Sequence, residues 1–323
     1  MDWRKLAVAV LCLGAGLSVS CSGGGGSAGQ GSGGGQGRAG PPMPVIVDET
    51  GIPTTSTASR IAFTNVSLVD MQDETVAASQ TVLVEDGLIV AIGSTGNVTI
   101  PADADVIDGT GRYLMPGLAD MHVHHLVGSD GHEDLLVQLA AGVTTVRIMW
   151  GGMGHLNWRA RIRAKELPGP RLYVASPGLE GNPPYWPASV VVANETEARD
   201  AVRAQVAAGY DFIKVYNQLQ LALYDAIIDE AGALDIPVVG HVPRAFSADY
   251  AVAAGQSTIE HFSGFAAHAT TTGGWSGSID SSKLAGLIEQ IRLQGTWNCP
   301  TLTVRSRTAS QVNALRSNPA YAL

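Results

Sequence analysis

The chain has 323 residues, enough for one large domain and a smaller one. Its formal net charge of -9 at pH 7 argues against a nucleic-acid-binding surface, which requires clustered lysine and arginine. Cys12 and Cys21 lie near the N-terminus, so Cys299 is the one cysteine in the part expected to fold. We therefore expect no disulfide framework.

The first twenty residues have the pattern of an export signal. Arg4 and Lys5 precede an apolar run, residues 6–17, that is too short to span a bilayer comfortably. The tetrapeptide Ser-Val-Ser-Cys that follows resembles a bacterial lipobox, although serine stands where that motif prefers leucine. We expect residues 1–20 to be a lipoprotein signal peptide and Cys21 to carry the lipid. An ordinary secretory signal cleaved nearby is the alternative.

Residues 21–59 are rich in glycine, serine and, towards the end, proline and threonine. Such a stretch cannot bury enough apolar surface to fold and is expected to act as a flexible tether. The sequence thus predicts an exported protein anchored to a membrane and facing the periplasm or cell envelope.

Residues 60–115 predict a small all-β unit. Asp86-Gly87 is expected to form a hairpin turn, because both residues tolerate the positive φ angles that such turns require. The predicted strands are Ile61–Val69, Gln80–Glu85, Leu88–Ile92, Val106–Gly109 and Tyr113–Met115.

From residue 116 onwards, apolar runs of strand length alternate with amphipathic helices, which indicates parallel strands covered by helices. The predicted helices include Glu133–Ala141, Glu195–Ala208, Leu221–Gly232 and Ser282–Gln294. The predicted strands are Gly117–His124, Thr144–Trp150, Arg171–Ser176, Phe212–Asn217, Pro237–Val242, Ser257–His261 and Thr296–Val304. We interpret residues 116–323 as an α/β fold, a (β/α)8 TIM-type barrel lacking its eighth strand, with a doubly wound sheet as the alternative.

Candidate metal ligands lie near the ends of four predicted strands. His122 and His124 share one face of the first strand, because side chains alternate along a strand, and two imidazoles on one face can hold a metal ion. His241 and His261 end the fifth and sixth strands. A single histidine in such a place is more often a hydrogen-bonded core residue, but the shared location at the active-site end of a barrel favours a metal site.

Lys214 lies inside the apolar fourth strand, where a charged ammonium group is costly. A lowered pKa would leave the amine free to react with carbon dioxide, and the resulting carbamate could bridge two cations. The ordinary alternative is a lysine whose head group reaches the surface.

Residues 114–124, Leu-Met-Pro-Gly-Leu-Ala-Asp-Met-His-Val-His, resemble the opening of the barrel of the amidohydrolase superfamily. The β unit at 60–115 resembles part of the small β-sandwich of those enzymes. The motifs at 212–216, 237–243 and 257–261 follow in the family's order. Residues 214–216, 240–243 and 299–302 are similar to the imidazolonepropionase-like and prolidase-like branch.

The resemblance implies a role for each candidate. His122 and His124 would bind the more buried of two divalent metal ions, carbamylated Lys214 would bridge both ions, and His241 and His261 would bind the second. Zinc is the default expectation, since it suits imidazole and carboxylate-like ligands. The metals would activate a hydroxide that attacks a carbonyl carbon.

Two further residues are candidates for substrate binding. Tyr216 shares the face of Lys214 and could reach a substrate oxygen, or it could be a packing residue. Arg147 could bind a substrate carboxylate, although relatives often have an acidic residue directly after that arginine and this chain has Ile148.

The family's catalytic base is an aspartate after the eighth strand, and no such strand is evident. The only aspartate after His261 is Asp280, whose natural role is to cap a helix. We therefore expect a C-terminally truncated enzyme. The predicted function is hydrolysis of a carbon–nitrogen bond in an amide, cyclic amide or Xaa-Pro-type dipeptide, with a small-molecule substrate. The alternative is a catalytically inactive, lipid-anchored metal- or ligand-binding module. Homo-oligomerisation is left open.

Overall fold

The computed structural model describes residues 59–302, apart from 72, 74, 126, 128–131 and 275–276. The predicted signal peptide, Cys21 and nearly all of the predicted tether lie outside the described residues. The chain divides into two compact units between Gly117 and Leu118, where the sequence placed the boundary after Met115.

The first unit is a five-stranded sheet in the order β3-β2-β1-β4, with β5 paired to β1. Asp86 and Gly87 both have positive φ angles, 48° and 80°, so the predicted hairpin turn between β2 and β3 is confirmed. The described residues of this unit form one sheet, and the second layer of the predicted sandwich remains a prediction. The strands are β1 (Arg60–Val69), β2 (Val76–Glu85), β3 (Leu88–Ser94), β4 (Asp105–Asp108) and β5 (Tyr113–Leu114).

The second unit is built on parallel strands that follow one another in chain order, except that β10 lies outside β9. One sheet has the order β6-β7-β8 and the other the order β10-β9-β11-β12-β13-β14, with parallel pairing throughout. A parallel bridge between Ala175 and Phe212 connects the two sheets. The strands are β6 (Leu118–Val123), β7 (Val143–Ile148), β8 (Arg171–Val174), β9 (Leu179–Glu180), β10 (Val190–Val191), β11 (Ile213–Val215), β12 (Val238–Gly240), β13 (Thr258–Glu260) and β14 (Trp297–Cys299).

The seven predicted parallel strands correspond to β6, β7, β8, β11, β12, β13 and β14, so the prediction of an α/β fold with parallel strands is confirmed. Side chains of β6 and β13 meet, since His122 contacts Glu260 across 138 residues of sequence. The strands therefore curve around a common interior. No pairing of β6 with β14 is present among the described residues, and closure of the barrel remains a prediction.

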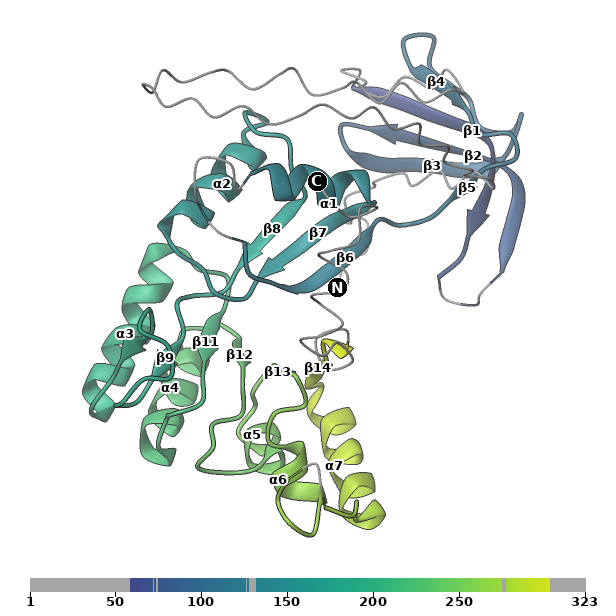
Figure 1. Cartoon of the computed structure of the whole chain (residues 1–323). Helices are drawn as coiled ribbons and strands as arrows, with labels where there is room; N and C mark the ends of the chain where they lie inside the picture. The colour runs from purple at the N-terminus through teal and green to yellow at the C-terminus, as the bar shows by residue number, and fades with distance from the viewer. Residues whose placement is uncertain are drawn as a thin grey trace, which may run out of the picture. The chain divides into compact units, whose positions relative to one another are not determined.

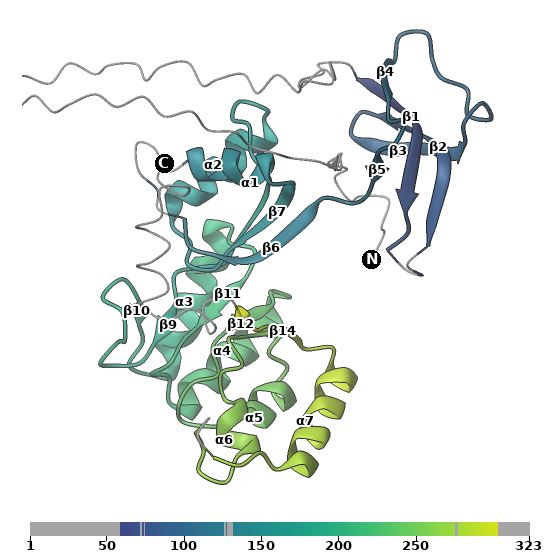
Figure 2. The same ribbon diagram turned by 45° about the vertical axis from the view of Figure 1, so that its right-hand side comes forward.

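Helices connect these strands and pack on their outer side, as Figures 1 and 2 show for α3, α4, α5 and α7. The main apolar core lies between them and the strands, and it includes Val202 of α3, Ile227 of α4, Val252 of α5 and Leu287 of α7. Within the described ranges, no helix is long and apolar enough to cross a membrane. The helices are α1 (Glu133–Ala140), α2 (Met153–Arg163), α3 (Glu195–Ala208), α4 (Leu221–Ala233), α5 (Ala248–Ala253), α6 (Phe265–Ala269) and α7 (Ser281–Gln294).

A side-chain cap explains where α7 begins. Asp280 precedes α7, and its Oδ1 accepts hydrogen bonds from the backbone N–H groups of Ser282 and Lys283. This satisfies donors that have no partner within the helix. The predicted N-cap role of Asp280 is thereby confirmed. Its carboxylate is engaged in hydrogen bonds with the first turn of α7.

Candidate metal centre

The four candidate histidines and Lys214 come together at the carboxyl ends of the parallel strands. His122 is the last residue but one of β6, and His124 follows that strand directly. His241 follows β12 and His261 follows β13, while Lys214 is the central residue of β11. Because parallel strands present their carboxyl ends at the same edge, residues far apart in sequence converge there.

The imidazole rings form a contiguous cluster. The Nε2 atoms of His122 and His124 are 3.2 Å apart. The ring of His122 lies 4.4 Å from that of His261, and the rings of His241 and His261 are 5.0 Å apart, measured between centroids. His261 has a φ of 61°, a left-handed conformation that is uncommon for a residue with a side chain and that recurs at functional sites.

Three of these histidines are held through the same ring nitrogen, Nδ1. His122 Nδ1–H donates to Glu260 Oε2 at 2.6 Å, and His241 Nδ1–H donates to Asn217 Oδ1 at 2.8 Å. A carboxylate and an amide oxygen can only accept, so Nδ1 of each ring carries the proton of its hydrogen bond, and Nε2 is the ring nitrogen left for a metal ion.

His261 follows the same rule through Thr301. The Thr301 hydroxyl donates to the carbonyl oxygen of Pro300 at 2.8 Å, so it accepts the short hydrogen bond from His261 Nδ1. Sequence reasoning missed Asn217, Glu260 and Thr301 as orienting partners. Their position at or just after a strand end was the one signal that could have found them.

The pKa values of two imidazoles in the cluster favour binding of a cation. Burial, aided by the neighbouring imidazoles and Lys214, lowers the pKa of His124 to about 4 and that of His241 to about 2. These rings are therefore neutral at pH 7, and neutral imidazole is the form that binds metals. A donor set of clustered imidazoles fits divalent ions such as zinc.

Lys214 is fully buried, with 1 % of its surface exposed. Burial lowers the pKa of its amine to about 8, and the positive charge of Arg147 acts in the same direction, while Glu260 opposes it. Gly240 of the adjacent strand makes room for this side chain. A Cβ at that position would lie 3.0 Å from Lys214 Cδ and 2.2 Å from the carbonyl oxygen of Val215, and its φ is 132°.

Glu260 of β13 links its own strand to β6 and β7 through hydrogen bonds. Besides His122, its carboxylate accepts hydrogen bonds from Arg147 Nη2 at 2.8 Å and from Thr258 Oγ1 at 2.6 Å. Burial alone would raise the pKa of Glu260, but the hydrogen bond from His122 and the charges of Arg147 and Lys214 outweigh it and lower the pKa to about 2. Glu260 is therefore an anion that offsets buried positive charge.

Arg147 is buried, with 2 % of its surface exposed, and it contacts the imidazole cluster through Glu260. Its guanidinium donates to the carbonyl oxygen of Met121 at 2.7 Å and to Thr258 Oγ1 at 3.2 Å as well as to Glu260. The structure thus places this predicted substrate-binding residue within a hydrogen-bond network of the protein interior, where it holds Glu260.

Cys299 adds a sulfur atom beside this network. One potential ligand atom from each of His122, Glu260 and Cys299 lies within 4.8 Å of the other two. Burial, together with the charge of Glu260, raises the pKa of the Cys299 thiol to about 11. Because the Glu260 carboxylate already accepts three hydrogen bonds and the thiol stays protonated, we interpret this trio as support for His122 and not as a separate metal site.

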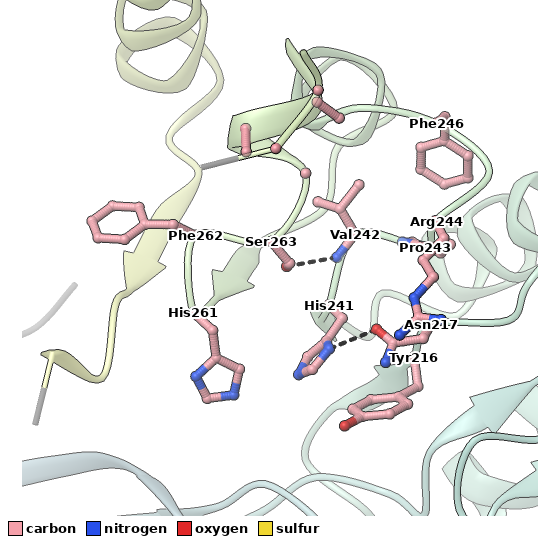
Figure 3. Close-up of a pocket in the computed structure, with 15 residues that line it drawn as sticks. Tyr216, Asn217, His241, Val242, Pro243, Arg244, Phe246, His261, Phe262 and Ser263 are labelled. Atoms are coloured by element: carbon pink, nitrogen blue, oxygen red, sulfur yellow. Dashed lines mark hydrogen bonds between the residues drawn. The ribbon is translucent and has the colours of Figure 1, made fainter. Parts of the chain in front are cut away.

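The imidazole cluster opens into a cavity of about 690 Å³. Figure 3 shows His241 and His261 side by side in its wall, with Tyr216 beside His241. The rings of Tyr216 and His241 are 4.1 Å apart, and Trp186 Nε1–H donates to the Tyr216 hydroxyl at 3.0 Å. Tyr216 therefore lies next to both the proposed ligands and the cavity, which keeps it a candidate for contact with substrate.

The fold and the site define a class of protein: an α/β protein on parallel strands with neutral imidazoles and a buried lysine converging at the strand ends. No protein-family model matches the chain. The imidazolonepropionase of Geobacillus sp. (strain WCH70) is 32% identical over 91 residues, which is 26% of this chain and 21% of that protein. The chain thus matches about a fifth of the length of this curated relative, and dihydroorotases and an enamidase match over shorter segments.

Solved structures match over a larger share. A bottromycin amidohydrolase has a TM-score of 0.58 at 26% identity, covering 82% of this chain and 62% of that one. A Bifidobacterium longum protein assigned as a prolidase has a TM-score of 0.62 at 25% identity, covering 79% and 67%. These matches support an amidohydrolase superfamily member.

Proposed function

We propose that the protein is a metal-dependent hydrolase that cleaves a carbon–nitrogen bond in an amide, a cyclic amide or an Xaa-Pro-type dipeptide. The observation that carries this proposal is the shared anchoring of His122, His241 and His261 through Nδ1, which leaves Nε2 of each ring for a metal ion. Relatives named imidazolonepropionase, dihydroorotase and enamidase support the type of bond.

In this proposal His122, His124, His241, His261 and Lys214 hold two divalent metal ions, with zinc as the default. Such ions supply Lewis acidity: they lower the pKa of a bound water towards neutral and polarise a carbonyl group. The protein's own contribution is to hold three imidazoles through Nδ1, to keep His124 and His241 neutral, and to surround the cluster with buried groups.

Lys214 takes part as a carbamate. Its Nζ attacks carbon dioxide, an N–C bond forms, and one proton leaves to solvent, so a neutral amine becomes an anionic ligand with two oxygens. The pKa of about 8 supports this step, because it leaves a larger share of the amine unprotonated at neutral pH than an exposed lysine would have.

The test is metal content and turnover of the purified full chain and of its Lys214→Ala variant, with His268→Ala as a control outside the cluster. We expect two metal ions per chain in the parent and the control, and fewer in Lys214→Ala, with partial rescue by small carboxylates such as propionate. An unchanged metal content in Lys214→Ala would remove the carbamate. Metal uptake without hydrolysis of any amide, cyclic amide or dipeptide would favour the alternative of a binding protein.

The proposal also places the protein at a membrane. Cys21 would carry the lipid and the segment that follows would act as the tether, so that the hydrolase faces the periplasm or the cell envelope. This rests on the sequence pattern of the first 59 residues.

A further inference from the structure

Arg244 stands out in the cavity beside the imidazole cluster. It follows His241 by three residues and is the only side chain of permanent charge among the described residues that line the cavity. The other lining side chains are neutral, and several are apolar, such as Val242 and Phe246. Figure 3 shows Arg244 on the same side of the cavity as Tyr216.

The guanidinium of Arg244 is available to bind a ligand. Across the described parts of the chain, it makes no hydrogen bond and no ion pair with another side chain. Its contact is with an aromatic ring, since its Cζ lies 5.4 Å from the centroid of Tyr185. Stacking on an aromatic face fixes the plane of a guanidinium and leaves its five N–H groups free to donate.

A small aromatic cluster holds this arrangement. The ring of Tyr185 lies 5.9 Å from that of Tyr216 and 5.4 Å from that of Trp186. Glu180 orders the loop that carries Tyr185 and Trp186, because its Oε2 accepts their backbone N–H groups at 2.8 and 3.3 Å and the hydroxyl of Ser189 at 2.7 Å. The ordered ring of Tyr185 thus holds the guanidinium of Arg244 at the cavity.

We propose that Arg244 is the anchor for a free carboxylate of the substrate, so that the protein acts on N-acyl amino acids or dipeptides whose acidic end lies beside the amide that is cleaved. A carboxylate matches the planar fork of a guanidinium with two parallel hydrogen bonds. The inference rests on the proposed function. It assigns to Arg244 the role that the sequence suggested for Arg147, whose guanidinium is engaged in the interior.

The competing explanation is that Arg244 only balances the charge of Glu180. That carboxylate is buried, and its Oε2 is engaged by three donors. A balancing role would make Arg244 matter equally for acidic and neutral substrates, whereas an anchoring role makes it matter only for substrates with a carboxylate.

The experiment uses pairs of compounds that share the scissile amide and differ in the carboxylate. Leucyl-proline is paired with leucyl-pyrrolidide, and N-acetylphenylalanine with N-phenethylacetamide. For the zinc-loaded full chain we expect kcat/KM to be about 10- to 100-fold higher for the acid, the range of a charge-assisted hydrogen bond. Arg244→Met is expected to remove this preference by slowing the acid alone. Arg161→Met, which removes a positive charge from an exposed position on α2, is the control.

Binding is measured separately, by calorimetry with N-acetylphenylalanine and N-phenethylacetamide, so that the inference is tested even without turnover. We expect tighter binding of the acid by the parent chain and by Arg161→Met, and equal binding of both compounds by Arg244→Met. Equal binding by the parent, or an equal loss for both compounds in Arg244→Met, would overturn the anchor. Acid-selective binding without any hydrolysis would leave the anchor standing and refute the proposed function.

Discussion

At the scale of single residues, the candidate site depends on the partners of the histidines. Glu260, Asn217 and Thr301 each accept the Nδ1 proton of a different imidazole. Partners of this kind orient metal ligands and raise their basicity. Glu260 does more than the other two, because it also neutralises Arg147 in the protein interior.

We expect Glu260→Gln to weaken binding of divalent metal about 10- to 100-fold, the usual cost of losing such a partner. A glutamine that turns its oxygen to Arg147 must turn its NH2 group to His122 Nδ1, which forces the imidazole proton onto Nε2. Metal affinity is measured by competition with a chromophoric chelator. Glu289→Gln, which breaks an exposed pair with Arg292, is the control and should leave the affinity unchanged.

The same substitution is expected to destabilise the fold, by about 3–5 kcal/mol, because it leaves the charge of Arg147 buried without compensation. Circular dichroism must therefore establish that the variant is folded at the temperature of the metal titration. A folded variant with the affinity of the parent would show that Glu260 acts only as a structural ion-pair partner.

At the scale of elements, each site residue owes its position to a short strand and to what ends it. β11, β12 and β13 have three residues each, so Lys214 lies one residue before the end of its strand, and His241 and His261 lie directly after theirs. The positive φ of Gly240 turns the chain at the end of β12, and those of His261 and Phe262 turn it after β13. The helices between these strands hold them in register by packing on their outer side.

The N-terminus of α3 allows a direct test of local stabilisation. Asn194 Oδ1 accepts the backbone N–H of Glu197 at 3.0 Å, and Glu197 Oε2 accepts the backbone N–H of Ala193 at 2.8 Å. We expect Asn194→Ala to lower the free energy of unfolding by about 1 kcal/mol. Urea unfolding measures it, with Gln220→Ala as the control, since Gln220 precedes α4 without a capping side-chain hydrogen bond. Equal effects of the two substitutions would contradict the capping role.

At the scale of the whole molecule, all candidate metal ligands belong to the unit that begins at Leu118. Binding of a ligand to the folded state stabilises it by about 2.7 kcal/mol when the free ligand is at 100 times its Kd. The stabilisation should therefore appear in that unit and leave the first unit largely unaffected.

Hydrogen exchange followed by mass spectrometry tests this expectation. We expect zinc to slow exchange in peptides that contain β6, β11, β12 and β13 and to leave β1 and β2 unchanged, with reversal by a chelator. A uniform change across both units, or no change near the histidines, would argue against the proposed metal centre.

The anchoring of the whole protein is tested through Cys21. In a bacterial host we expect the parent chain in the membrane fraction and Cys21→Ser in the soluble fraction, because the acyl chains supply the membrane affinity. Cys12→Ser, a cysteine within the apolar segment, is the control and should fractionate like the parent. Identical fractionation of Cys21→Ser and the parent would refute the lipid anchor.

The sequence alone was sufficient to predict features that depend on near neighbours along the chain. The Asp86-Gly87 turn, the helix cap at Asp280 and the seven parallel strands all follow from local conformational preference and from the period of apolar residues. The placement of the candidate histidines at strand ends follows from the same pattern, since it needs only the position of each residue within its strand.

Only the tertiary structure decided which side chains meet. His122 and Glu260 are 138 residues apart, and Arg147 and Glu260 are 113 apart, so their contacts depend on how the strands curve around the interior. The sequence could not show that Arg147 is engaged there while Arg244 faces the cavity. The physical reason is that burial and hydrogen-bond partners are set by packing between distant segments, which local patterns do not encode.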